Sequence, residues 1–271
     1  MIGKKHAGPV CQKRSYYTRK PSRPQPGGWP RPRQEAPILH GGPAMYFFDL
    51  DGTLLDSNGI WLDIDIEFLG RRGISPVPED YTDYVTHHSA PDAARYTRER
   101  FSLPETPEEI MEGWMSMARS AYAHTLPLKP GVPAFLDACR RRGTRMAVLT
   151  SCMPPLCRAA LEHHRLLDCF EAVYTTAELG IEKRDPALYC LAAERSGVPP
   201  QSCLLFEDSP SYCAAARQAG FTVVGVFDPL FAPRWGEMEA LCHHRLERFA
   251  DASPTLWQIP SFCSFLPLKM C

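Results

Sequence analysis

From Met45 onward, short apolar runs alternate with longer segments whose apolar residues recur at helical spacing. The apolar runs predict buried strands of a parallel sheet, and they read MYFFDL, TRMAVLTS, AVYTT, SCLLFEDS and TVVGVFD. Two of the longer segments carry a proline near their start and a glycine at their end, as helices do, namely Pro130–Gly143 and Asp185–Gly197. This alternation predicts an α/β fold with a doubly wound, Rossmann-like parallel sheet. We also predict a helix in RWGEMEALCHHRLERF, after Pro229.

A long insertion separates the first predicted strand from the second. Residues 58–126 show no strand pattern, but NGIWLDIDIEFLGRRG and PEEIMEGWMSMARSAYAHT have apolar residues at helical spacing. We therefore predict a small α-helical cap that sits above the strand ends as a lid. The core is expected to comprise residues 45–57 and 127–250, while residues 251–271 have no pattern that assigns them a structure.

The first 44 residues differ in composition from the rest. They contain eight prolines, nine Lys or Arg and one Glu, without apolar periodicity. Such a segment cannot bury enough apolar surface to fold, so we expect residues 1–44 to be a disordered basic leader. It is open whether this leader contacts an anionic surface, targets the chain, or is no part of the native protein. The third interpretation is favoured, because Met45 directly precedes the first strand.

Charge and cysteine content narrow the possible partners. Without the leader, 30 − 9 = 21 basic and 31 − 1 = 30 acidic residues remain, a net charge of −9. An acidic body is a poor partner for nucleic acid. The sequence shows no secretory signal and no apolar run long enough to span a membrane, and its 11 cysteines form no CxxC pair. We expect a cytoplasmic protein with reduced thiols, monomeric and without a membrane partner.

Acidic residues stand where two predicted strands end. Asp49 and Asp51 follow the first strand, and Glu207 and Asp208 follow the strand SCLLFEDS. Residues two apart on a strand point the same way, and parallel strands end at one edge of the sheet. Converging carboxylates repel one another unless a cation holds them, and hard oxygen ligands suit Mg²⁺. The pattern therefore predicts a Mg²⁺ site and a small phosphorylated metabolite as substrate.

The same strand ends offer groups for phosphoryl transfer. One aspartate could attack phosphorus and form an aspartyl-phosphate, while the other protonates the leaving oxygen and then activates water. Thr150 and Ser151, at the end of the second strand, would donate hydrogen bonds to phosphoryl oxygens, and Lys183 would face the developing charge. Each residue alone is more often an ordinary surface residue, so the hypothesis depends on their joint pattern.

These residues belong to four ordered motifs. FFDLDGTLLDS, VLTS, EKRDPALY and LLFEDSPSYCAAARQAG resemble the motifs of the haloacid dehalogenase-like hydrolase superfamily, from Met45 to about Asp228. The pattern is most similar to the branch of phosphoglycolate phosphatases and β-phosphoglucomutases. The resemblance implies a doubly wound core with a helical cap inserted after the first motif, and a phosphoric monoester hydrolase that requires Mg²⁺.

The resemblance also implies roles for single residues. Asp49 would be the nucleophile and Asp51 the general acid and base, while Thr150 binds phosphate and Lys183 stabilises its charge. Dehalogenases lack an acid at the place of Asp51, so this residue favours phosphate transfer over carbon–halogen chemistry.

The implied Mg²⁺ ligands are Asp49, Asp208 and the backbone carbonyl of Asp51, with Glu207 close beside them. Two positions depart from the usual motifs. Tyr212 stands where relatives often have glycine, and Arg184 follows Lys183.

Two rival functions remain open, an intramolecular phosphomutase and a catalytically idle binding protein of the same fold. In β-phosphoglucomutases a hinge histidine restrains the counterpart of Asp51, and an ungapped alignment puts Trp61 at its place. An indole cannot accept a hydrogen bond, so we expect the restraint on water to be missing and the aspartyl-phosphate to hydrolyse promptly, which favours the phosphatase.

The cap sequence does not identify the substrate, although several of its side chains are candidates to contact it. The candidates in the cap are His87, His88, Arg95, Tyr96 and Trp114. Cys152, just after the second strand, is either a buried inert thiol or a redox-sensitive one, and the inert alternative is favoured.

Overall fold

The computed structural model describes residues 44–88 and 90–252, and a single parallel sheet organises them. Its six strands lie in the order β3-β2-β1-β4-β5-β6, and all neighbours are parallel. The strands are β1 (Met45–Phe48), β2 (Met146–Thr150), β3 (Ala172–Thr175), β4 (Cys203–Glu207), β5 (Thr222–Val226) and β6 (His244–Leu246). The order is that of a doubly wound fold, so the predicted fold class is confirmed. It reverses between β1 and β4, where such sheets bind ligands at their carboxyl ends.

Helices cover both faces of this sheet. They are α5 (Val132–Arg141), α6 (Pro154–His163), α7 (Thr176–Leu179), α8 (Pro186–Arg195), α9 (Pro210–Gln218) and α10 (Met238–Leu241). Short 3₁₀ turns occupy Leu167–Cys169, Pro200–Ser202, Pro229–Glu237 and Phe249–Asp251. None of the helices in the described ranges is both long and apolar enough to cross a bilayer.

Alternate residues of each strand face opposite layers of helices. Phe48 and Phe206 stack with ring centroids 4.6 Å apart, and Phe135 of α5 packs edge-on against both. Their neighbours Phe47 and Leu205 belong to the second core cluster, which includes residues of α8 and α9. The continuous apolar runs read from the sequence therefore reflect strands that are buried on both faces.

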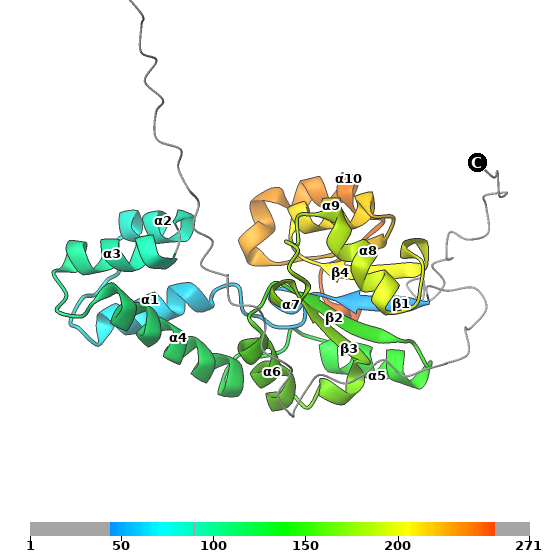
Figure 1. Cartoon of the computed structure of the whole chain (residues 1–271), viewed down its shortest axis with the longest axis horizontal. Helices are drawn as coiled ribbons and strands as arrows, with labels where there is room; N and C mark the ends of the chain where they lie inside the picture. Colours follow the sequence, from blue (N-terminus) through cyan, green and yellow to red (C-terminus); the bar gives the residue numbers. More distant parts are fainter. Residues whose placement is uncertain (1–43, 89, 253–271) are drawn as a thin grey trace, which may run out of the picture.

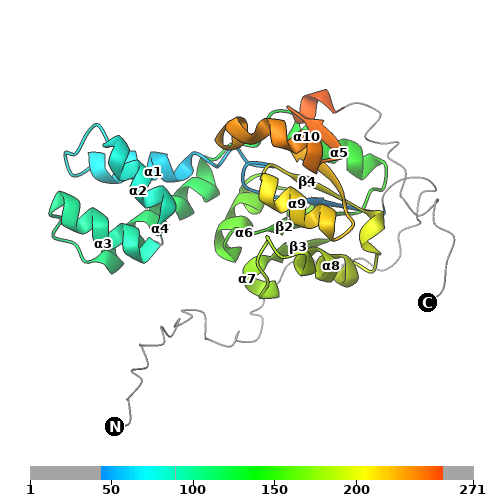
Figure 2. The ribbon, with the colours of Figure 1, turned by 90° about the horizontal axis from the view of Figure 1, so that it is seen from above.

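Four helices form the insertion between β1 and α5. They are α1 (Ile60–Gly70), α2 (Glu79–His87), α3 (Ala90–Phe101) and α4 (Pro107–His124). Figures 1 and 2 both show them grouped to one side of the sheet. Inside the group, the fully buried Tyr81 hydroxyl bonds to Asp65 at 3.2 Å and Thr97 at 3.0 Å. The insertion is helical as predicted, with α2 and α3 lying between the two segments recognised from the sequence.

The prediction of a helix after Pro229 is wrong. A 3₁₀ segment and the short α10 take up its first part, and its second part forms β6. Pro233 lies inside the 3₁₀ segment, directly before the first residue of the predicted helix. The His243 ring accepts a hydrogen bond from the Val223 amide at 3.0 Å, and β6 pairs with β5. Pairing with the free edge of the sheet thus prevails over helical propensity.

Two connections join the insertion to the core, and they pair with each other. The Asp56 amide donates to the carbonyl of Pro127 at 3.0 Å, and the Lys129 amide donates to that of Leu54 at 2.9 Å. The Lys129 ammonium is buried and lies 2.6 Å from the carboxylate of Asp228 beyond β5. A buried ion pair is costly to break, so it anchors the second connection to the core.

Candidate active site

The first motif ends β1 and turns the chain sharply. Asp49 continues the sheet, since its amide donates to the carbonyl of Phe206 at 3.0 Å. Gly52 follows with φ of +76°, and a Cβ there would lie 2.2 Å from Oδ2 of Asp208 and 2.1 Å from Nδ2 of Asn58. Only glycine fits both the backbone conformation and the close approach. This turn brings the end of β1 against the residues that follow β4.

Three carboxylates meet at this switch point of the sheet. Asp49, Glu207 and Asp208 are all buried, and each offers an oxygen within 4.8 Å of the others. Burial raises the pKa of Asp49 to about 7, and burial is also the largest cause of the raised pKa of Glu207 and of Asp208. Three buried carboxylate oxygens that converge in this way form a donor set that fits a hard divalent cation such as Mg²⁺. Glu207, expected close beside the ligands, is a full member of this cluster.

Lys183 is the cation that the protein itself supplies. Its buried ammonium pairs with Asp49 and lies 2.7 Å from Glu207. Burial alone would lower the pKa of Lys183, but the carboxylates of Asp49 and Glu207 raise it well above its usual value. The Tyr212 ring centroid is 5.0 Å from the ammonium. The departure from glycine at position 212 therefore adds a cation–π contact to this lysine.

Asp51 lies in a different environment, at the hinge of the insertion. Its Oδ1 accepts hydrogen bonds from Ser57 at 2.7 Å and from Tyr122 of α4 at 2.6 Å. Burial, and then the Asp51 charge, raise the pKa of Tyr122, so its hydroxyl remains a donor. These two hydroxyls hold Asp51, while the absence of a restraint on water stays a prediction. Trp61, at the aligned histidine position, is 48% exposed.

The two hydroxyls expected at the end of β2 differ in burial. Thr150 is buried, and its Oγ1 accepts from the Cys152 amide at 3.0 Å, so the hydroxyl keeps its own proton as a donor. Ser151 is exposed. Cys152 is buried, and burial raises the pKa of its thiol. The structure therefore favours the inert interpretation of this cysteine.

The cap side chains expected to contact substrate, where described, contact other cap residues instead. His88 stacks on Tyr84 with centroids 3.7 Å apart, and Arg95 pairs with Asp92 on its own helix. Tyr96 stacks against Tyr81 at 6.1 Å. Trp114 is buried against Phe68 at 5.8 Å. The side chain of His87 lies outside the described residues.

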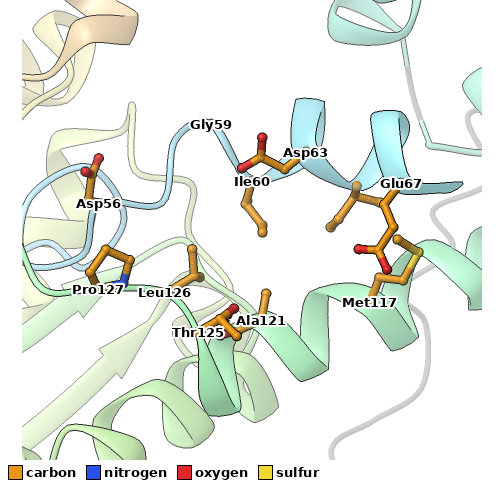
Figure 3. A pocket seen from close by; sticks show the side chains of 11 residues that line it. Asp56, Gly59, Ile60, Asp63, Glu67, Met117, Ala121, Thr125, Leu126 and Pro127 are labelled. Carbon is orange, nitrogen blue, oxygen red and sulfur yellow. Dashed lines mark hydrogen bonds between the residues drawn. The ribbon is translucent and has the colours of Figure 1, made fainter. Parts of the chain in front are cut away.

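A groove of about 430 Å³ lies beside the hinge, between α1 and α4 (Figure 3). Apolar side chains of Ile60, Ile64 and Leu126 line it together with the carboxylates of Asp56, Asp63 and Glu67. Ala121 of α4 and Thr125 just after it border the groove, while the intervening Tyr122 reaches Asp51. The end of α4 therefore separates the groove from the acid.

Four residues at the site were missed in the sequence. Thr53 and Asn58 donate to Asp208 at 3.3 and 2.8 Å, and Ser57 and Tyr122 donate to Asp51. Thr53 and Ser57 lie within the first motif and Asn58 directly follows it, so polar residues in this tight turn are a signal that could have been used. Tyr122 lies 71 residues from Asp51, and no sequence pattern links the two.

Comparison with known proteins decides the family. The family model of haloacid dehalogenase-like hydrolases matches residues 46–226. The chain belongs to this family. The predicted superfamily is thereby confirmed, together with its branch of phosphatases and β-phosphoglucomutase-like proteins. The predicted enzyme class of phosphoric monoester hydrolases is also confirmed.

Two curated relatives and one solved structure illustrate the similarity. This hydrolase is 25% identical to hexitol phosphatase B of Escherichia coli over 182 residues, 64% of this chain and 78% of the relative. It is 28% identical to the probable pseudouridine-5'-phosphatase of Drosophila melanogaster over 227 residues, 79% of this chain and 94% of the relative. The putative β-phosphoglucomutase from Thermotoga maritima superposes with a TM-score of 0.68 at 22% identity, covering 78% and 96% of the two chains.

The raised pKa of Asp49 makes stability depend on pH in the metal-free protein. The folded state keeps the Asp49 proton up to about pH 7, whereas the unfolded carboxyl releases it near its ordinary pKa of about 3.9. The folded state thus binds more protons in this window, and the free energy of unfolding falls as pH rises through it, by up to about 1.4 kcal/mol per pH unit. In EDTA, thermal melting of the Asp49→Asn variant should lose this slope, and Mg²⁺ should stabilise the parent more at about pH 8 than at about pH 6. Equal slopes in parent and variant would contradict the assignment.

Proposed function

We propose that this hydrolase is a Mg²⁺-dependent phosphatase of a small phosphorylated metabolite, acting through an aspartyl-phosphate on Asp49. The observation that carries the proposal is that two aspartates only two residues apart lie in different surroundings. Asp49 is buried against Lys183 and the other strand-end acids, and Asp51 is held by hydroxyls at the hinge. One site thus contains a nucleophile beside a cation and a separate acid–base group.

The reaction has two steps. A carboxylate oxygen of Asp49 attacks phosphorus, the bond to the leaving oxygen breaks, and Asp51 gives its proton to that oxygen. Asp51 then removes a proton from water, the water oxygen attacks phosphorus, and the bond to Asp49 breaks to release phosphate. Lys183 offsets the charge on Asp49, and Thr150 donates to a phosphoryl oxygen.

Asp49, Asp208 and the backbone carbonyl of Asp51 would hold the Mg²⁺, with Glu207 close enough to join or orient them. The bound ion supplies positive charge that lets the buried carboxylates and the phosphate coexist. Thr53 and Asn58 orient Asp208 through the hydrogen bonds described above.

A phosphorylated sugar or sugar alcohol is the best supported substrate class. The relatives include proteins named hexitol phosphatase and phosphorylated carbohydrates phosphatase. We further propose that residues 58–126 form the cap that selects the substrate, because the active acids belong to residues 45–57 and 127–250. An idle binding protein is disfavoured, since buried charges such as Lys183 and Glu207 cost folding free energy without a function.

A panel of phosphorylated metabolites, with released phosphate as the readout, tests the phosphatase. Hydrolysis should stop in EDTA and return with Mg²⁺. Asp49→Asn should lower turnover by at least about 10⁴-fold, and Asp208→Asn should raise the Mg²⁺ concentration needed for half-maximal rate. Asp56→Asn, the same change at an exposed neighbour, is the matched control and should retain activity. Full activity without metal, or in Asp49→Asn, would exclude this mechanism.

A phosphomutase is the second candidate, because the hydroxyls on Asp51 provide a restraint that such an enzyme needs. Phosphorus NMR of β-glucose 1-phosphate mixed with the enzyme separates the two functions. We expect inorganic phosphate to accumulate without build-up of glucose 6-phosphate. Rapid conversion to glucose 6-phosphate with little free phosphate would instead identify a mutase.

A further inference from the structure

We propose that Tyr122 is a positioning residue through which the cap sets the orientation of the acid–base group Asp51, an inference that rests on the proposed phosphatase function. Asp51 belongs to the core motif, whereas Tyr122 belongs to α4 of the inserted helices. Their hydrogen bond at 2.6 Å is a direct polar link from cap to catalytic carboxylate. It assigns to Tyr122 a role in the proton-transfer steps and none in the attack by Asp49.

The geometry fixes one oxygen of the carboxylate. Tyr122 and Ser57 both donate to Oδ1 of Asp51, at 2.6 and 2.7 Å. Two donors on the same oxygen restrict rotation of the carboxylate more than one donor would, and hydrogen bonds to a charged acceptor are strong. The Tyr122 ring is itself buried, with 4% exposure. The hydroxyl is therefore presented from a packed side chain and not from a mobile surface one.

The hinge explains why the cap can hold this position. The isolated bridges Asp51–Leu55 and Leu55–Leu128 link the acid's turn to the segment that follows α4. The hydrogen bonds between the two connections, from Asp56 to Pro127 and from Lys129 to Leu54, extend that pairing. A displacement of α4 against the core would move the Tyr122 hydroxyl relative to Oδ1. Position of the cap and orientation of Asp51 are thus coupled.

The chemistry predicts a selective defect when this contact is lost. An alkyl phosphate has a poor leaving alcohol that requires the proton of Asp51, whereas p-nitrophenolate leaves without one. General acid catalysis contributes about 10²–10⁴-fold to rate. A misoriented Asp51 therefore slows cleavage of the alkyl ester and spares the aryl ester.

The experiment compares the full-length parent with Tyr122→Phe, which keeps the ring and removes only the hydroxyl. Transfer of the phosphoryl group is measured in single turnovers, with enzyme and Mg²⁺ in excess over ethyl phosphate or p-nitrophenyl phosphate. We expect release of ethanol to slow by about 10- to 100-fold, and release of p-nitrophenolate to stay within about threefold of the parent. With excess p-nitrophenyl phosphate, the variant should show a burst followed by slow turnover, since Asp51 must also activate water.

Tyr81→Phe is the matched control, because it removes another buried cap hydroxyl that has two hydrogen bonds but lies away from Asp51. It should affect both esters alike, if at all. Ser57→Ala tests the second donor to the same oxygen, and its effect should be non-additive with that of Tyr122→Phe. The positioning role would be overturned if Tyr122→Phe lost the same share of its rate on both esters. Rates equal to those of Tyr81→Phe, or faster cleavage than in the parent, would overturn it as well. If the parent cleaves neither ester, the proposed function itself fails, and the role of Tyr122 fails with it.

Discussion

The site depends on one constraint, the burial of negative charge. This charge lies between β1 and β4, where the strand order reverses. Asp49, Glu207 and Asp208 are buried together there, and Lys183 is the one cation among the described residues that pairs with this cluster. Desolvation raises the pKa values of all three acids. A fold gains nothing from such a cluster by itself, since uncompensated buried charge opposes folding. The arrangement is understandable when a divalent cation and a phosphate complete the charge balance.

The packing of the core makes this concentration of charge possible. The Phe48–Phe206 stack and its neighbours hold β1 against β4, so the residues that follow both strands have little freedom. Gly52 then allows the chain to turn within van der Waals distance of Asp208. Two residues after Asp49, the same turn directs Asp51 toward the hinge and into contact with α4. One tight turn therefore gives the two neighbouring aspartates their different positions and proposed roles.

The sequence was sufficient for what depends on local pattern. Buried strands, strand-end acids and the helical insertion could be read from it, because periodicity and motif spacing encode them directly. β6 was missed because its residues have no strand pattern, and pairing with the edge of β5 decides their structure. Tyr122 was missed because only the folded hinge brings α4 to Asp51. The alignment of Trp61 concerned only the hinge histidine, so it could not indicate a hydroxyl that reaches Asp51 from a distant helix.

Whether Asp49 receives the phosphoryl group is the central claim, and acid quenching tests it most directly. The enzyme would be mixed with p-nitrophenyl phosphate labelled with radioactive phosphorus, quenched during turnover, and digested under acidic conditions that preserve acyl phosphates. The account predicts label on the peptide that contains Asp49, and no label in the Asp49→Asn variant. Label on another residue, or phosphate release by a parent enzyme that never carries label, would contradict it.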